Sequence, residues 1–186
     1  MKNIVNLLFE AKILKEIPRS GYHFLGSGHE SISEHSFSTS FIALIMSKLE
    51  PSIDALKLIS MCLMHDLPEA RMGDLNYVQK MYSSTNEPKA LNDMACNVPF
   101  GDDLIALVDE FNEGKSLEAQ FARDADQLSL LLELKALLDQ GQRGPEKWIP
   151  GIQKRLCTQI GKDIAHMITK TEWDEWWFTQ LSNAQK

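Results

Sequence analysis

The stretch LKLISMCLMHDLPEARMGDL, residues 56–75, is the most informative part of this chain. Its first half is apolar almost all the way round a helix, which is typical of a helix buried on every side. His65 and Asp66 end that apolar run. Burying an imidazole and a carboxylate is unfavourable unless both are compensated. A mutual hydrogen bond or a bound metal ion would compensate them, and for this pair alone the hydrogen bond is the more common solution.

Helical spacing of apolar residues continues through most of the chain, and no segment alternates as a strand would. We predict an all-α fold, a compact bundle of six or more helices. Residues 67–100 are expected to be irregular, apart from a short helix near 75–81. Ser31 or Ser33 can cap the second helix, and Glu34 completes a capping box with Ser31. The expected helices span about 1–17, 31–50, 52–66, 102–112, 117–140, 150–168 and 171–183.

Two other apolar helices also carry ionisable residues. His35 lies in the first turns of the helix at 31–50, and the helix at 117–140 carries Asp124 and Asp126. The latter helix is apolar on opposite sides, so periodicity does not choose between its two aspartates. Desolvated ionisable groups on three separate buried helices favour a metal site over isolated hydrogen-bonded pairs.

Three blocks of sequence carry a family resemblance: ESISEHSFSTS at 30–40, LMHDLPEARMGDL at 63–75 and EGKSLEAQFARDADQL at 113–128. In this order they resemble the HD-domain phosphohydrolases, in the branch that contains the 5′-deoxynucleotidases. The resemblance covers about residues 5–140 and implies an HD-domain helical bundle. It also implies one metal ion held by His35, His65, Asp66 and Asp126, and so selects the second aspartate of RDADQL.

The implied ligands are two imidazoles and two carboxylates, which suit Mn²⁺, Co²⁺, Fe²⁺, Ni²⁺ or Zn²⁺. Mg²⁺ fits less well because it prefers oxygen ligands. Between Asp66 and Asp126 there is no histidine. Binuclear relatives use additional histidines in that interval, so a single divalent transition metal per chain is expected.

The resemblance implies catalytic roles for two further carboxylates. Glu69 corresponds to a residue that activates or positions the attacking water, although a carboxylate at a helix N-terminus is also simply stabilising. Asp74 corresponds to a second acid, base or substrate contact, although it can equally cap a helix.

Substrate contacts are expected from the loop before the second helix. Arg19 resembles the family's phosphate-binding arginine, whose planar fork matches two phosphate oxygens. Tyr22 is a candidate for stacking on a base. The deoxynucleotidases place a bulky aromatic residue directly after the arginine, whereas this chain has Ser20 there. Selection against a ribose 2′-hydroxyl is therefore not carried over. Arg71 is either a further cation of the site or an ion-pair partner of Glu69 or Asp74.

Length and charge limit the other functions. The chain has 186 residues, 44% of them hydrophobic, and a net charge of −7. We expect one domain spanning 1–186. No basic cluster suggests binding to nucleic-acid polymers, and no apolar run reaches the roughly 18–20 residues of a membrane span. Three scattered cysteines favour a reducing, cytoplasmic setting. The tryptophan-rich end, Trp173–Phe178, is expected to pack in the core or at a homodimer interface.

The leading functional hypothesis is a metal-dependent phosphohydrolase that releases phosphate from a nucleoside 5′-monophosphate, with deoxynucleotides as candidates for preferred substrates. Another small phosphoester or a signalling nucleotide is an alternative substrate. A non-catalytic helical module with a structural metal is the alternative from a different class. The presence of Glu69, Asp74 and Arg19 favours the enzyme, because a structural metal site requires none of them.

Overall fold

The computed structural model describes residues 1–184, and within that range it consists of helices and their connections plus one isolated β-bridge between Pro18 and Ser31. This confirms the predicted all-α class. The α-helices are α1 (Lys2–Ile13), α2 (Tyr22–Leu25), α3 (Ile32–Leu49), α4 (Ala55–Met64), α5 (Glu69–Met72), α6 (Tyr77–Tyr82), α7 (Glu87–Ala95), α8 (Gly101–Glu113), α9 (Leu117–Asp139), α10 (Ile149–Arg155), α11 (Gln159–Lys170) and α12 (Glu175–Ala184). Two short 3₁₀ helices, Leu14–Glu16 and Gly144–Lys147, join them.

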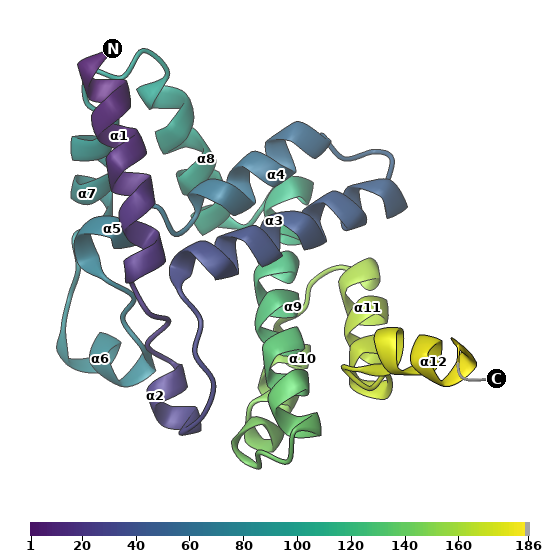
Figure 1. Ribbon diagram of the computed structural model, residues 1–186. Helices are drawn as coiled ribbons and strands as arrows, with labels where there is room; N and C mark the ends of the chain where they lie inside the picture. Colours follow the sequence, from purple (N-terminus) through teal and green to yellow (C-terminus); the bar gives the residue numbers. More distant parts are fainter. Residues whose placement is uncertain (185–186) are drawn as a thin grey trace.

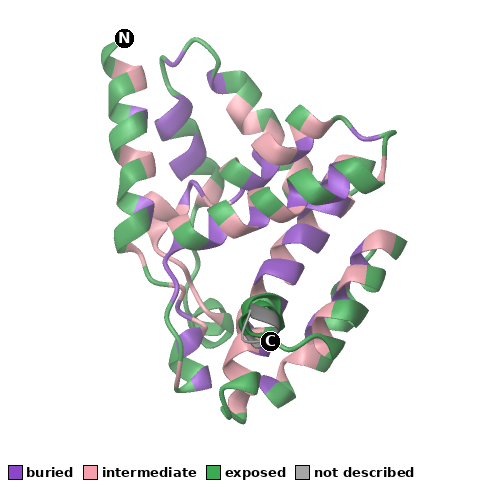
Figure 2. Cartoon of the chain, turned by 45° about the vertical axis from the view of Figure 1, so that its right-hand side comes forward, coloured by how far each residue is buried: buried purple, intermediate pink, exposed green. Residues whose placement is uncertain are grey.

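Helices α3, α4 and α9 form the centre of the bundle and pack against one another (Figure 1). The long helix α9 is rich in buried residues along its length (Figure 2). Fully buried side chains in this core include Met46 from α3, Leu58 and Met61 from α4, and Leu128 and Leu131 from α9. Burial of a large aliphatic side chain stabilises the fold by about 1.5–3 kcal/mol, so these three helices are fixed relative to one another.

A smaller apolar cluster joins the N-terminal segment to the region after α4. Its buried members are Leu7, Leu14, Ile32, Leu67, Met94 and Val98. Leu67 follows Asp66 directly, and Ile32 begins α3. The cluster therefore fixes the chain just before His35 and just after Asp66.

Helix starts follow the expected capping chemistry, with two differences in position. The capping box of Ser31 and Glu34 at the start of α3 is present as predicted. Helix α4 begins after Asp54, which accepts a hydrogen bond from the Lys57 backbone N–H at 3.0 Å, and so starts later than the expected residue 52. Helix α7 lies inside the region that was expected to be irregular. Asn86, which also suits a turn, caps it instead.

The helix predicted at 150–168 is wrong as a single element. The structure divides it into α10 and α11, with Thr158 as the N-cap of α11. The backbone N–H groups of Cys157 and Thr158 both donate to the Asp124 carboxylate on α9, at 2.7 and 2.8 Å. This long-range contact, which local periodicity does not reveal, stabilises the break.

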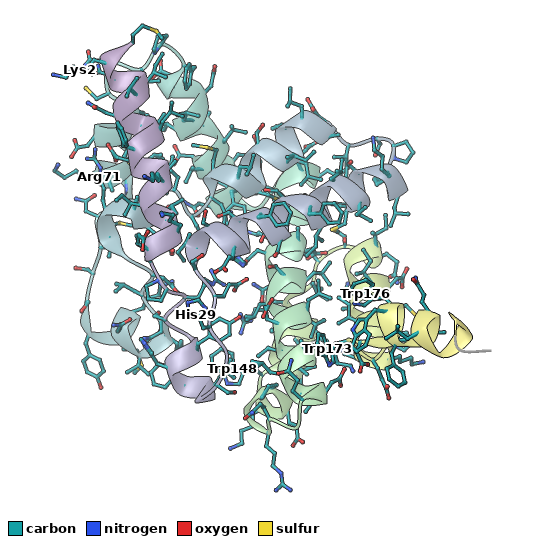
Figure 3. All side chains as sticks on the ribbon, in the orientation of Figure 1. Lys2, His29, Arg71, Trp148, Trp173 and Trp176 are labelled. Carbon is teal, nitrogen blue, oxygen red and sulfur yellow. The ribbon has the colours of Figure 1, made fainter. Side chains whose placement is uncertain are left out.

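The C-terminal aromatic residues lie at the surface of this chain. Trp173 and Trp176 border an apolar groove between α9, α11 and α12 (Figure 3), and 44% and 74% of their respective surfaces are exposed. The expectation that they pack in the chain's own core is therefore wrong. Their packing in a homodimer stays a prediction. Among the described residues, no helix has the length and apolar character needed to cross a bilayer.

Candidate metal and substrate site

The first turn of α3, the end of α4 and the middle of α9 bring three of the predicted residues together. His35 is completely buried near the start of α3, His65 is the C-cap residue of α4, and Asp126 lies on α9. One potential ligand atom from each of the three lies within 4.8 Å of the other two. The His35 Nε2 atom is 3.0 Å from Oδ1 of Asp126. This spacing suits a shared metal ion.

Asp66 completes the ring of potential ligands. Its Oδ2 atom lies 3.2 Å from Nε2 of His65 and 3.7 Å from Nε2 of His35. The same oxygen accepts a hydrogen bond from Nη1 of Arg19 at 3.3 Å. All four residues predicted as ligands therefore converge, and a cationic side chain from the preceding loop lies directly beside them.

The orientation of His65 leaves a buried nitrogen without a hydrogen bond. Its Nδ1–H donates to the Cys62 carbonyl oxygen at 2.8 Å, which turns Nε2 towards the aspartates. Nε2 is buried and has no hydrogen-bond partner among the described residues, although Oδ2 of Asp66 lies 3.2 Å away. Buried polar atoms without a partner are rare in folded proteins. A metal ion would satisfy this one.

His35 is held by contacts on both ring nitrogens. Oγ of Ser129 lies 3.3 Å from Nδ1, and Oγ1 of Thr39 lies 3.4 Å from Nε2. Burial lowers the pKa of His35 and outweighs the opposing effect of its hydrogen bond to Asp126. The imidazole is therefore neutral at physiological pH, and this is the form that binds metals.

The two aspartates of α9 have different surroundings. Asp124 is fully buried and accepts hydrogen bonds from the start of α11, whereas Asp126 faces His35. The second oxygen of Asp126, Oδ2, accepts a hydrogen bond from Nε2 of Gln127 at 2.8 Å. Oε1 of Gln127 in turn accepts one from Arg155 at 3.1 Å. Of the pair left open by periodicity, the structure places Asp126 in the cluster.

The HD domain family model matches residues 11–167, which include all of these residues. The chain belongs to the HD domain family. This confirms the resemblance inferred from the three blocks of sequence, in which His65 and Asp66 form the HD pair, and it confirms the helical bundle that the resemblance implied.

Known relatives are distant in sequence and close in fold. The chain is 25% identical over 138 residues to the protein named 5′-deoxynucleotidase HDDC2 from Bos taurus, an alignment that covers 71% of this chain and 66% of that relative, just under two thirds of its length. A conserved hypothetical protein from Pyrococcus furiosus superposes with a TM-score of 0.74 and 26% identity, over 90% of this chain and 99% of that one. The PH0347 protein from Pyrococcus horikoshii OT3 gives 0.73 and 28%, over 89% and 98%.

The charged side chains of the HD pair and its neighbours alter one another's pKa values. Burial disfavours the charged forms of His65 and Asp66, but their mutual attraction outweighs it. The pKa of His65 is raised to about 9, and that of Asp66 is lowered to about 2, with Arg19 contributing to the latter. The carboxylates therefore draw a positive charge to Nε2 of His65. A proton provides that charge in the metal-free protein, and a bound metal ion would replace it.

Arg19 is held in a loop that is closed by backbone hydrogen bonds. Its N–H donates to the Glu30 carbonyl oxygen at 2.8 Å, and Ile32 N–H donates to the Ile17 carbonyl oxygen at 2.9 Å. The buried Glu30 carboxylate lies 3.9 Å from Nε of Arg19 and 4.0 Å from Nδ1 of His35. Glu30 thus supports both the predicted phosphate-binding residue and a predicted ligand.

Tyr22 supports Glu30 through a hydrogen bond. Only 7% of Tyr22 is exposed, and its hydroxyl donates to Oε2 of Glu30 at 3.3 Å. A Cβ atom at Gly28 would approach the Tyr22 ring to 2.8 Å, so glycine allows the loop to pack on the ring. This burial favours a supporting role for Tyr22 over direct stacking on a base.

Glu69 lies at the start of α5, three residues after Asp66. Its Oε2 atom is buried and has no hydrogen-bond partner among the described residues. Burial, together with the nearby carboxylates of Asp66 and Asp74, raises the pKa of Glu69 to about 9. A cation beside Asp66 would oppose this shift. The unpartnered carboxyl oxygen is available to a water molecule or a substrate.

Asp74 and Arg71 make contacts that local sequence does not reveal. Oδ2 of Asp74 accepts hydrogen bonds from the Ser20 backbone N–H at 2.7 Å and from its hydroxyl at 3.3 Å. Asp74 therefore positions the loop that carries Arg19. Arg71 forms a double hydrogen bond with Glu10 on α1, 2.8 Å for each, and so pairs with neither Glu69 nor Asp74.

The sequence interpretation missed several supporting residues: Glu30, Gln127 and Ser129. Glu30 lies in the first of the quoted blocks and Gln127 in the third, but neither has a local pattern that indicates its partner. A signal for Glu30 was nonetheless present, since it directly precedes the capping serine of α3 and so had to lie close to His35.

Proposed function

We propose that this protein is a metal-dependent phosphohydrolase that cleaves nucleoside 5′-monophosphates. The observation that carries the proposal is the buried, unpartnered Nε2 atom of His65, set among His35, Asp66 and Asp126 and beside the guanidinium of Arg19. A cluster of ligands alone is consistent with a structural metal. An adjacent cation together with an unpartnered carboxyl group is what hydrolysis of an anionic ester requires.

His35, His65, Asp66 and Asp126 would hold the metal ion. Two imidazoles and two carboxylates suit a divalent transition metal, and the neutral state of His35 fits ligation. When bound, a divalent metal supplies Lewis-acid polarisation of the phosphoryl oxygen and of the attacking water.

The remaining residues divide the reaction between binding and proton transfer. Arg19 binds the phosphoryl oxygens, because its Nη1 already lies at the edge of the cluster and its fork can span two oxygens. A bound metal ion beside Asp66 would oppose the rise in the pKa of Glu69, and the deprotonated Glu69 then accepts a proton from the water that attacks phosphorus. The bond between phosphorus and the 5′ oxygen breaks, and the proton held by Glu69 passes to that oxygen, directly or through water. The products are inorganic phosphate and a nucleoside.

Nucleotides are proposed as substrates because curated relatives at 24–26% identity are named 5′-deoxynucleotidases. In this chain the residue after Arg19 is Ser20, which is buried and hydrogen-bonded to Asp74. With its hydroxyl engaged by Asp74, Ser20 offers no bulky aromatic ring to select against a ribose 2′-hydroxyl. The proposal therefore includes both ribonucleotides and deoxyribonucleotides.

The test is reconstitution with defined metals. The purified protein is treated with a chelator, supplied separately with Mn²⁺, Co²⁺, Zn²⁺ or Mg²⁺, and assayed for phosphate release from ribo- and deoxynucleoside monophosphates. Metal-dependent release that Asp66→Ala abolishes would support the proposal. Release that persists in Asp66→Ala, or an inactive protein that binds metal, would overturn it. The second result would direct the search to other phosphoesters or a structural metal.

A further inference from the structure

A cavity of about 220 Å³ opens directly beside the HD pair. His65, Asp66 and Glu69 line one part of it, and Lys80 from α6 and Asn112 from α8 line another. The cavity is predominantly polar and partly enclosed by α5, α6 and the start of α7. It is therefore the space in which a small ligand of this site would lie.

The side chains that line this cavity include more acidic groups than permanently cationic ones. Its lining includes three carboxylates, from Asp66, Glu69 and Glu87. Among the described residues that line it, Lys80 is the only one with a permanently cationic side chain. An anionic substrate entering such a cavity is repelled unless cations offset the carboxylates. Arg19 approaches Asp66 from the neighbouring loop, and Lys80 provides positive charge from within the cavity itself.

The ammonium group of Lys80 is not engaged elsewhere. It forms no ion pair and no side-chain hydrogen bond with the residues that the structure describes. Two neighbouring cations differ in this respect, because Arg71 pairs with Glu10 and Lys89 pairs with Asp93. An exposed lysine without a partner is usually just solvated. Its position on the wall of this cavity distinguishes Lys80 from such a residue.

The segment just before Lys80 is anchored at two points. Asp74 binds the backbone of Ser20 in the Arg19 loop. Asn76 and Gln79 then form a capping box that starts α6. Lys80 follows directly on this anchored turn, so its backbone position is fixed while its long side chain keeps its reach. A compact ammonium on a flexible stem is suited to contact with phosphate.

We infer that Lys80 is a substrate-binding residue whose ammonium group contacts the phosphoryl group of the substrate from the wall of this cavity. This inference rests on the proposed phosphohydrolase function. Lys80 would raise affinity for the phosphorylated substrate without participating in proton transfer, so its loss should affect KM more than kcat.

The experiment compares Lys80→Ala and Lys80→Arg with the wild-type protein, each loaded with the metal that supports activity. We expect Lys80→Ala to raise KM about tenfold and to weaken competitive inhibition by inorganic phosphate by a similar factor. Lys80→Arg, which keeps the charge, should recover most of both. Metal content and melting temperature should stay unchanged. Unchanged KM and phosphate inhibition in Lys80→Ala would overturn the inference.

Lys48→Ala is the matched control. Lys48 is exposed on α3, thirteen residues after His35, a distance of about 20 Å along the helix. The same variants also separate this inference from the function on which it rests. If the wild-type protein hydrolyses no nucleotide, calorimetric measurement of inorganic phosphate binding to the metal-loaded proteins still tests whether Lys80 contacts phosphate. Weaker binding in Lys80→Ala alone would support the role of Lys80, whereas equal binding, or none to the wild type, would overturn it.

Discussion

Asp124 and Asp126 lie two positions apart on α9, and their carboxylates serve opposite sides of that helix. Asp124 accepts hydrogen bonds from the Thr158 backbone N–H at 2.8 Å and hydroxyl at 2.6 Å. Asp126 lies 3.0 Å from Nε2 of His35. Two residues correspond to about 200° of rotation round a helix. One short stretch thereby joins the C-terminal helices to the predicted metal cluster.

The paired variants Asp124→Asn and Asp126→Asn should separate stability from metal binding. Asparagine at 124 places an amide group against N–H donors, so we expect a loss of about 2–4 kcal/mol in the free energy of unfolding. Asp126→Asn should fold normally but lose the rise in melting temperature that a bound metal gives the wild type. Thermal unfolding with and without Mn²⁺ or Zn²⁺ measures both. A full metal response in Asp126→Asn would exclude Asp126 as a ligand.

Glu69→Gln should reduce kcat by about 10²–10⁴-fold, the usual contribution of a general base. The amide keeps the size of the side chain but cannot accept the proton from water. Metal content should not change, because Glu69 is not among the clustered ligands. Glu87→Gln is the control, since Glu87 lines the same cavity but is hydrogen-bonded by Asn112. Steady-state kinetics and metal analysis test this, and equal losses in both variants would refute a specific role for Glu69.

Glu30→Gln should raise KM about tenfold while kcat changes little. The amide cannot hold Arg19 by charge, so the guanidinium loses one of its two carboxylate neighbours. Tyr22→Phe removes only the hydroxyl that donates to Glu30 and should have a smaller effect in the same direction. Glu30→Asp should recover part of the affinity. If Glu30→Gln lowers kcat and leaves KM unchanged, then Glu30 does not act through Arg19.

The three cysteines should differ in reactivity with a thiol reagent. Cys96 and Cys157 are exposed, whereas Cys62 is fully buried on α4 and burial raises the pKa of its thiol. Because the thiolate is the reactive form, two thiols per chain should react in the folded protein and the third only after unfolding. Titration with an aromatic disulfide, with and without denaturant, counts them. Rapid reaction of all three in the folded protein would contradict the packing of α4.

The sequence was most informative where a pattern is local. The capping box of Ser31 and Glu34 and the helix that leads to His65 follow from neighbouring residues. The expectation that this helix is buried on every side was wrong, because Leu56 and Leu63 lie on an exposed face of α4. The break between α10 and α11 did not follow, because the residue that stabilises it, Asp124, lies more than thirty positions earlier. Helix α7 was missed for another reason. Asn86 and Pro88 suit both a turn and a helix start, and only tertiary contacts decide between them.

The candidate site shows the same division. Three blocks of sequence indicated the residues that converge on the cluster, because helical periodicity and family resemblance can both be recognised within short segments. The supporting contacts of Glu30 with Arg19, of Asp74 with Ser20 and of Gln127 with Arg155 connect different segments of the chain. No pattern within one segment specifies such pairs.

The loop from Arg19 to Glu30 is closed at its base by the hydrogen bond between those two residues and by the bridge of Pro18 with Ser31. Its outer part, including His23 and Phe24, is exposed. Arg19 is therefore held by contacts that do not involve the exposed side chains of the tip. Exchanges of His23 and Phe24 that keep Tyr22 and Leu25 in place should leave the guanidinium in register with the HD pair. This makes the tip the place where a change of side chain can alter the surroundings of the loop while the residues beneath it keep their positions.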